Sequence, residues 1–223
     1  MARDDWYRNK EWTADIEAAF RTKLSKARSQ KSQYIVIQAG YLAHGYPAAA
    51  LALIDEYFKT GDDFDVARAY CVQAEARLSL GRIGEAVASY KEALDYETRR
   101  PGVITTASLD LAKIVAENRL SSEYDFTLEI LTTRFKESDF SFPNLRYVWN
   151  GSNALIADDL GHHVEAQEFA ERALRAAAET ESPYRYHRTM GLVKNSSDDF
   201  GRRIKRIARP SKMRALFRLA ISK

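Results

Sequence analysis

The run Tyr70–Leu94 (YCVQAEARLSLGRIGEAVASYKEAL) constrains the fold more than any other segment of the chain. It predicts two amphipathic helices joined by a tight turn at Gly81. Two antiparallel helices approach to about 8–10 Å when small side chains lie at the crossing and large ones fill the space beside it. The run supplies both kinds: the small residues Ala74, Ala86 and Ala93, and the large residues Tyr70, Leu78, Val87, Tyr90 and Leu94.

Similar helical hairpins recur along the chain, so the sequence carries an internal repeat. A first copy turns at Gly45, 36 residues before Gly81, and a clear later copy turns at Gly161. A degenerate copy between them has Ser122 where the turn glycine stands elsewhere, and residues 136–144 that follow it are a predicted loop. The inward positions that we assign to the first copy are Tyr34, Ile37, Gln38, Tyr41, Ala50, Ile54 and Tyr57.

The composition favours a helical chain without strands. The 223 residues are 45% hydrophobic and 29% charged, which is typical of a globular protein with one large domain or two small ones. Ala, Leu, Glu, Arg and Lys dominate the periodic segments, and alternating β-branched runs are absent. The single cysteine, a charged start without an apolar stretch and the lack of a run long enough to span a bilayer predict a cytoplasmic protein.

The repeated pattern resembles the tetratricopeptide repeat (TPR), a helical hairpin with a period of about 34 residues. The resemblance covers about residues 31–178, and the whole chain is similar to bacterial TPR-containing proteins of uncharacterised activity. It implies an all-α, TPR-like solenoid of about four hairpins with a capping helix at each end. We therefore expect an N-terminal aromatic segment and capping helix (1–30), TPR-like repeats (31–178) and basic C-terminal capping helices (179–223).

The resemblance also implies a concave groove, lined by the first helix of each hairpin, that binds a protein or peptide partner. The family's clamp for a peptide carboxylate uses lysines and asparagines, whereas this chain has Ile35, Ala39 and Cys71 there. We therefore expect an apolar segment or a helix as ligand, or a groove filled by the chain's own termini. The groove positions are Ile35, Ala39, Leu42, Arg68, Cys71, Glu75, Leu78, Leu109, Ala112, Ala116, Arg119, Val148, Leu155, Asp158 and Asp159.

The net charge of +3 conceals a basic C-terminal segment. Residues 181–223 contain 12 Lys and Arg against three acidic residues, a net charge of +9, whereas residues 1–180 carry −6. Such a segment suits phosphate contacts on nucleic acid, an anionic membrane, self-association into a homo-oligomer, or a solvated capping helix that pairs with the acidic body. The candidate nucleic-acid or anion contacts are Arg202, Arg203, Lys205, Arg206, Arg209, Lys212 and Arg214.

Hydrophobic spacing divides this basic segment into two short amphipathic helices. Ile204 and Ile207 mark the first, Pro210 separates the two, and Ser211 is a candidate cap for the second. At the other end of the chain, Thr13 is a candidate cap for a helix that runs to about residue 28. We expect the tryptophans of the leading segment, Trp6 and Trp12, to pin it onto the first helices, with partner anchoring as the alternative.

The sequence contains no catalytic or metal-binding constellation. Asp158 and Asp159 stand four residues before His162 and His163, but Gly161 ends the helix before these side chains converge. Cys71 has no neighbouring histidine in the sequence, so we interpret it as a partly buried small residue rather than a nucleophile. We therefore expect no enzyme activity, no cofactor and no metal. The predicted function is a scaffold or adaptor that binds a protein partner; the alternative is a nucleic-acid-associated protein that uses its basic tail.

Overall fold

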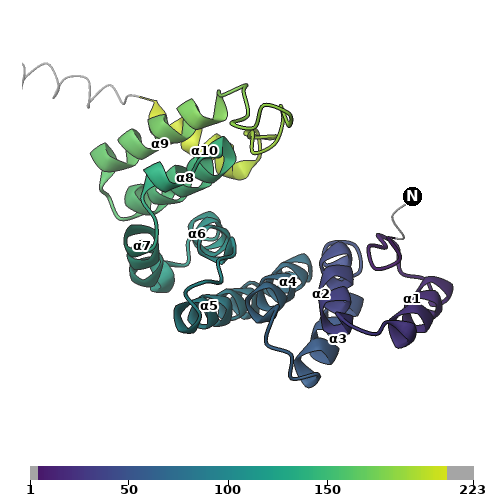
Figure 1. Cartoon of the computed structure of the whole chain (residues 1–223). Coiled ribbons are helices and arrows are strands. Elements are labelled where there is room, and N and C mark those ends of the chain that lie inside the picture. Colours follow the sequence, from purple (N-terminus) through teal and green to yellow (C-terminus); the bar gives the residue numbers. More distant parts are fainter. Residues whose placement is uncertain (1–4, 210–223) are drawn as a thin grey trace, which may run out of the picture. The chain divides into compact units, whose positions relative to one another are not determined.

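The computed structural model describes residues 5–209, and the regular structure in this range is entirely helical (Figure 1). The prediction of an all-α chain is confirmed. Two compact units meet between Ala107 and Ser108, and each is described by itself. The helices are α1 (Ala14–Lys26), α2 (Lys31–Leu42), α3 (Pro47–Lys59), α4 (Val66–Ser79), α5 (Ile83–Arg99), α6 (Ala107–Glu117), α7 (Tyr124–Thr133), α8 (Pro143–Asp159), α9 (His163–Ala177) and α10 (Asp199–Ala208).

Unit 1, which ends at Ala107, contains the first two predicted hairpins, α2/α3 and α4/α5, and α3 also packs on α4. Gly81 has φ +73°, a left-handed conformation that glycine adopts at little steric cost, and it forms the α4/α5 turn as predicted. Ala74, Ala86 and Ala93 are fully buried, as the close helix crossing requires. The hairpin that the Tyr70–Leu94 run predicts is therefore present.

The leading segment is fastened to α2, as predicted. Trp6 and Trp12 pack against the core cluster of unit 1. The backbone N–H and the side-chain Nδ2 of Asn9 both donate to Gln38 Oε1, at 3.0 and 2.8 Å. In return, Gln38 Nε2 donates to the backbone oxygen of Asn9 at 2.8 Å. Behind this segment, Thr13 Oγ1 accepts a hydrogen bond from Ile16 N and caps α1, which confirms the predicted cap. These reciprocal hydrogen bonds between Asn9 and Gln38 fix the position of the aromatic segment along α2.

The predicted inward face of α2 is partly wrong. Gln38 is buried as expected, but Tyr41 is 42% exposed and Val36 is fully buried. The reason is that α2 has neighbours on more than one side, because the core cluster of unit 1 joins residues of α1, α2, α3 and α4. A helix packed on several sides buries more than the single stripe expected for one hairpin contact.

Unit 2 contains the degenerate pair α6 and α7, the closely packed hairpin α8/α9, and α10. Gly161 has φ +81° and forms the α8/α9 turn. In the degenerate pair the left-handed residue is Arg119, with φ +52°, so the turn falls there and not at Ser122, which begins a short 3₁₀ turn instead. A non-glycine residue in this conformation is strained by about 1 kcal/mol, which fits a repeat that has lost its consensus turn.

The predicted loop 136–144 also needs correction. Glu137–Asp139 forms a 3₁₀ turn, Phe140 is buried, and α8 already begins at Pro143, whose fixed φ suits the first position of a helix. Phe140 belongs to a core cluster in which Trp149 Nε1 donates to Leu131 O at 3.2 Å. The insert thus contributes to the core of unit 2.

Helix α10 is the first of the two predicted C-terminal amphipathic helices. Asp198 caps it by accepting a hydrogen bond from Gly201 N at 2.9 Å. Ile204 and Ile207 are buried, as their spacing predicts. The predicted break at Pro210, the cap at Ser211 and the second helix lie outside the described residues.

Candidate functional site

The predicted groove positions on α2 do not form an open surface. Ile35, Ala39 and Leu42 are 3%, 0% and 0% exposed. They belong to the core cluster that α2 forms with residues of α1, α3 and α4, and α2 packs against α3 and α4. Assignment of these three side chains to partner contact is therefore wrong for this structure.

The predicted positions on α4 differ from one another in exposure. Arg68, near the start of the helix, is exposed, and Glu75 and Leu78 are half-buried. Cys71 is buried at 7% exposure, with Sγ 3.4 Å from Thr105 Oγ1. Arg68 is the predicted residue of this helix that is most accessible to a partner.

Arg68 borders an open pocket of about 620 Å³ in unit 1, which we call the α4 pocket. The loop before α4 and the loop after α5 form its sides. Phe64 and Ile104, one from each loop, are large apolar residues that are 73% and 71% exposed. The lining residues are Asp63, Phe64, Asp65, Ala67, Arg68, Tyr96, Arg100, Gly102, Val103, Ile104 and Thr105.

Hydrogen bonds to buried groups hold both loops of the α4 pocket. Tyr96 donates its hydroxyl proton to Asp63 O, and Arg100 pairs with the Asp63 carboxylate. The backbone N–H and the hydroxyl of Thr105 donate to Glu97 Oε1, at 2.8 Å and 2.5 Å, and Glu97 is 6% exposed. Phe64 and Ile104 are thus presented by loops of defined conformation, which lowers the entropy lost on binding.

Tyr57 supports the first of these loops from below. Its hydroxyl donates to Asp62 O and accepts from Asp65 N, both at 3.1 Å, and burial raises the pKa of the Tyr57 hydroxyl. The Asp62 carboxylate accepts from Ser32 and from Phe64 N, and these bonds lower the pKa of Asp62. The backbone of Phe64 is therefore fixed while its ring is exposed.

The charges of the α4 pocket nearly cancel. Burial raises the pKa of Asp65, and the neighbouring positive charge of Arg68 acts in the opposite direction. Asp63 is neutralised by Arg100. Within residues 5–209 the Arg68 guanidinium forms no ion pair within 4 Å, and its charge acts on the neighbouring Asp65.

Sequence reasoning missed Phe64 and Ile104 because both stand in linkers rather than on the helical faces. One signal was available: Phe64 is a large apolar residue among aspartates in DDFD, whereas Ile104 follows another apolar residue in VITT and is not marked by its neighbours. Their exposure shows that both side chains lie outside the core and are accessible apolar surface.

The predicted groove of unit 2 is also largely unavailable. Asp158 Oδ1 lies 3.0 Å from His163 Nδ1, within the α8/α9 turn. Arg119 lies in the turn after α6 and not on a helix face. Four apolar positions of this groove are at most 4% exposed, namely Leu109, Ala112, Ala116 and Leu155, whereas Val148 is half-buried.

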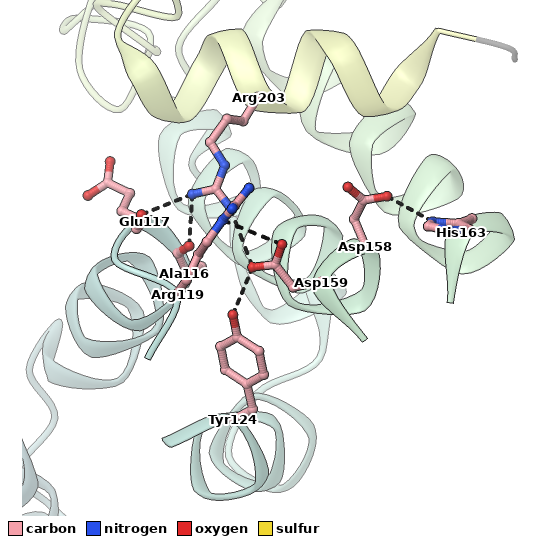
Figure 2. A network of polar contacts seen from close by, with 8 residues as sticks. All are labelled: Ala116, Glu117, Arg119, Tyr124, Asp158, Asp159, His163 and Arg203. Carbon is pink, nitrogen blue, oxygen red and sulfur yellow. Dashed lines mark hydrogen bonds and ion pairs between the residues drawn. The ribbon is translucent and has the colours of Figure 1, made fainter. Parts of the chain in front are cut away.

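Asp159 is the centre of a polar network in unit 2 (Figure 2). Tyr124 donates its hydroxyl proton to Asp159 Oδ2 at 2.8 Å, and burial together with this carboxylate raises the pKa of Tyr124 to about 12. Arg119 Nε lies 3.6 Å from Oδ1, and Arg203 Nη2 lies 3.5 Å from Oδ2. The Arg203 side chain is 11% exposed, so the second predicted anion contact is turned into the protein.

Arg203 also joins two helix ends. Its Nη1 donates to Ala116 O and to Glu117 O, both at 3.0 Å, at the carboxyl end of α6. Asp159 is the last residue of α8. Carbonyl groups at a helix end carry partial negative charge, so the Arg203 guanidinium is stabilised by the carboxyl end of α6 and by the Asp159 carboxylate.

The other basic residues of α10 do not share the internal contacts of Arg203. Arg202 pairs with Asp199 at 3.3 Å on the exposed side of the helix. The predicted contacts Lys205, Arg206 and Arg209 lie on the same helix or at its end, whereas Lys212 and Arg214 lie outside the described residues. Nucleic-acid binding through this segment stays a prediction. Arg203 is not available for it, because its guanidinium is bound to Ala116 O, Glu117 O and Asp159 within the protein.

Within the described range, 5–209, no three His, Cys, Asp or Glu side chains are grouped so that they could hold a metal ion. In the same range, no helix has the length and apolar character needed to cross a bilayer.

The comparison with protein families gives one match. Residues 67–98, which form most of α4 and nearly all of α5, match the model of the tetratricopeptide repeat. No curated protein and no solved structure matches the chain. The α4/α5 hairpin therefore matches a tetratricopeptide repeat, as the sequence pattern predicts, and such a repeat fits a role in protein–protein interaction.

Proposed function

We propose that the protein is a non-catalytic adaptor that binds a protein or peptide partner at the α4 pocket. The observation that carries the proposal is the pair Phe64 and Ile104, which are 73% and 71% exposed on fixed loops at the end of the tetratricopeptide repeat. Exposed large apolar side chains around a concave, preorganised surface are typical of binding hot spots. The proposal assigns no cofactor.

The partner chemistry follows from the lining of the pocket. An apolar side chain of the partner fills the space between Phe64 and Ile104, and an acidic group reaches the unpaired Arg68 guanidinium. Of the groove residues predicted on α4, Arg68 is retained as a contact, and Glu75 and Leu78 extend the surface along the helix. The three α2 positions are not part of it.

A quantitative pull-down from the native host tests the proposal. The full chain and the variant Phe64→Ser/Ile104→Ser serve as baits, and mass spectrometry compares the captured proteins. We expect the partner to be reduced roughly tenfold or more, because hot-spot truncations dominate binding energy. Both side chains are mostly exposed, so the variant should keep the wild-type circular dichroism and melting temperature.

The matched control is Val164→Ser, which removes an apolar side chain that is 67% exposed in unit 2. The control bait should capture the partner as the wild type does. If the Phe64→Ser/Ile104→Ser bait captures the same proteins in the same amounts, the α4 pocket is not the binding site.

A further inference from the structure

The link between α9 and α10, residues 178–198, combines aromatic and cationic side chains on its surface (Figure 1). It contains the run YRYHR, residues 184–188, which we call the aromatic loop, and every residue of this run is exposed. Tyr184 is 52% exposed and Tyr186 is 85% exposed. The Arg185 guanidinium lies 5.6 Å from the centre of the Tyr186 ring. The loop thus presents two accessible rings that alternate with arginine and histidine.

Hydrogen bonds and ring packing give the aromatic loop a defined conformation. Tyr184 N donates to Ser182 Oγ at 3.1 Å, and His187 N donates to Tyr184 O at 3.0 Å, which closes a turn. The Tyr184 ring packs on Phe142, directly before α8, with 5.3 Å between the ring centroids. A ring that is held in place before binding loses less entropy when a ligand stacks on it.

Gly191 fastens the following residues to the same phenylalanine. Its φ of +74° lies in the left-handed region, and a Cβ atom there would lie 2.0 Å from Phe142 Cδ1, so a side chain would displace that ring. Gly191 O accepts a hydrogen bond from Asn144 N at 2.8 Å, in the first turn of α8. Residues 184–191 are therefore held at both ends against the start of α8.

The outer side of α10 carries arginines along one face, which we call the arginine stripe. Helix α10 caps unit 2 with its apolar side buried against α8 and α9. Arg202, Arg206 and Arg209 are exposed and follow one another at spacings of four and three residues, which places them on one side of the helix. Arg202 pairs with Asp199, whereas Arg206 and Arg209 form no ion pair within residues 5–209.

Helix α8 brings the aromatic loop and the start of the arginine stripe near each other. The loop packs on Phe142, and five residues further on the Tyr147 ring meets Phe200 of α10 edge-on, with 5.6 Å between the centroids. Five residues correspond to about 7.5 Å along a helix axis. Arg202, the first residue of the stripe, also donates from Nη1 to Ser197 O in the link, at 2.9 Å. The two groups of side chains therefore adjoin within unit 2.

This surface has a large excess of positive charge. Residues 181–209 contain eight Lys and Arg against three acidic residues, and two of the acidic residues are engaged at the start of α10, Asp198 as the cap and Asp199 with Arg202. A cationic surface with few opposing carboxylates favours a polyanionic ligand. The exposed basic residues are Arg185, Arg188, Lys194, Arg202, Arg206 and Arg209.

We propose that the aromatic loop and the arginine stripe bind single-stranded nucleic acid. Tyr186 and the accessible part of Tyr184 stack on unpaired bases, and the arginines contact phosphates, which is how single strands are bound without sequence preference. An anionic membrane fits less well, because the apolar side of α10 is buried in unit 2 and cannot enter a bilayer. The inference goes beyond the adaptor function and uses no residue of the α4 pocket.

Fluorescence anisotropy of the full chain with labelled oligouridylate and oligothymidylate tests the proposal. We expect saturable binding that weakens roughly 50-fold between about 50 and 200 mM salt, as release of counterions from about four phosphates requires. The ratio of the two affinities shows whether RNA or DNA is preferred. A duplex of the same length should bind at least about fivefold more weakly, because its bases are not free to stack on the tyrosines.

Two loop variants locate the contact, each with a matched control. Tyr186→Ala should weaken binding at least about fivefold, whereas Tyr186→Phe keeps the ring and should bind as the wild type does. Arg185→Glu/Arg188→Glu should weaken binding at least about tenfold. Its control, Arg28→Glu/Lys59→Glu, changes the net charge equally at exposed sites of unit 1 and should retain most of the affinity. Thermal unfolding checks that each variant is folded.

Four results would overturn the proposal. These are no binding at the lower salt concentration, equal or tighter binding of the duplex, full binding by either loop variant, and binding to vesicles that contain phosphatidylserine without binding to either oligonucleotide. Full binding by a loop variant would place the contacts elsewhere in the chain. Phe64→Ser/Ile104→Ser should bind the oligonucleotides unchanged, which separates this result from the pull-down at the α4 pocket.

Discussion

The hairpins α4/α5 and α8/α9 follow the same pattern but have different surroundings. Both place alanines at the helix contact, and both turn at a left-handed glycine, Gly81 or Gly161. The start of α4 borders an open pocket with Phe64 exposed beside it, whereas α8 is covered by α10. The repeat pattern therefore specifies how two helices pack, and leaves the use of their outer face to the segments around them.

The largest expected effect on stability distinguishes Leu42 from Arg68, two residues that the sequence analysis assigned to the same groove. Leu42→Glu puts a charge at a fully buried site in unit 1, so we expect a loss of more than about 4 kcal/mol in the free energy of unfolding. Arg68→Glu, at an exposed site, should change it by less than about 0.5 kcal/mol. Urea unfolding measures both, and equal stability of the two variants would contradict the burial of α2.

A smaller effect is expected where α10 is held to unit 2. Arg203→Met keeps most of the side-chain volume but removes the bonds to Ala116 O, Glu117 O and Asp159, so we expect a loss of about 2–3 kcal/mol. Arg202→Met removes a pair whose arginine side chain is 65% exposed, and the change should stay below about 0.5 kcal/mol. Thermal unfolding distinguishes the two, and an Arg202 variant as unstable as the Arg203 variant would contradict the network in Figure 2.

Two helical glycines test whether the close approach of α10 matters. Gly151→Leu adds a side chain where Phe200 and Ile204 already lie, which should weaken α10 docking by about 1–3 kcal/mol. Gly84→Leu in α5 meets open space and gains helix propensity, so it should stabilise the chain by up to about 1 kcal/mol. Limited proteolysis after residue 198 should accelerate in the first variant only; the same rate in both would place α10 away from α8.

The smallest effect contrasts two buried tyrosines of unit 2. Tyr124 donates to Asp159, so Tyr124→Phe should destabilise by about 1 kcal/mol. Tyr147 Oη has no partner among the described residues, so Tyr147→Phe should stabilise by about 1 kcal/mol. Calorimetry measures both changes, and destabilisation by Tyr147→Phe would indicate a hydrogen bond at that hydroxyl.

The stability of the protein at alkaline pH tests the same two tyrosines, Tyr124 and Tyr147. Burial is the main cause that raises the pKa of Tyr124 and of Tyr147 to about 12 from the ordinary value of about 10. A raised pKa means that the folded state keeps the proton longer, so this part of the stability is present below pH 10 and is lost as the pH rises towards 12. The loss between pH 10 and 12 should be smaller in Tyr147→Phe, and an unchanged pH profile would contradict the burial of that hydroxyl.

Much of the fold was predictable because it depends on local pattern. Alanines at helix spacing, Gly81 and Gly161 at the turns, and Thr13 at a helix start act within a few residues, so the sequence reveals them. The degenerate turn was misplaced because Arg119 adopts a conformation that its residue type does not signal. The exposed pair Phe64 and Ile104 was missed because linkers carry no periodicity against which an unusual residue stands out.

The groove was only partly predictable, for a different physical reason. A helix-face assignment says which side chains point away from the hairpin partner, but burial depends on every segment that arrives from elsewhere. Ile35 and Leu42 are buried in the core that α2 shares with α3, α4 and residues of α1, and Arg203 is turned inward to Asp159 and the carboxyl end of α6. The sequence by itself determined the helical class, the turns at Gly81 and Gly161 and the α4/α5 repeat; tertiary structure alone decided which faces stay open, because that depends on contacts between residues far apart in the chain.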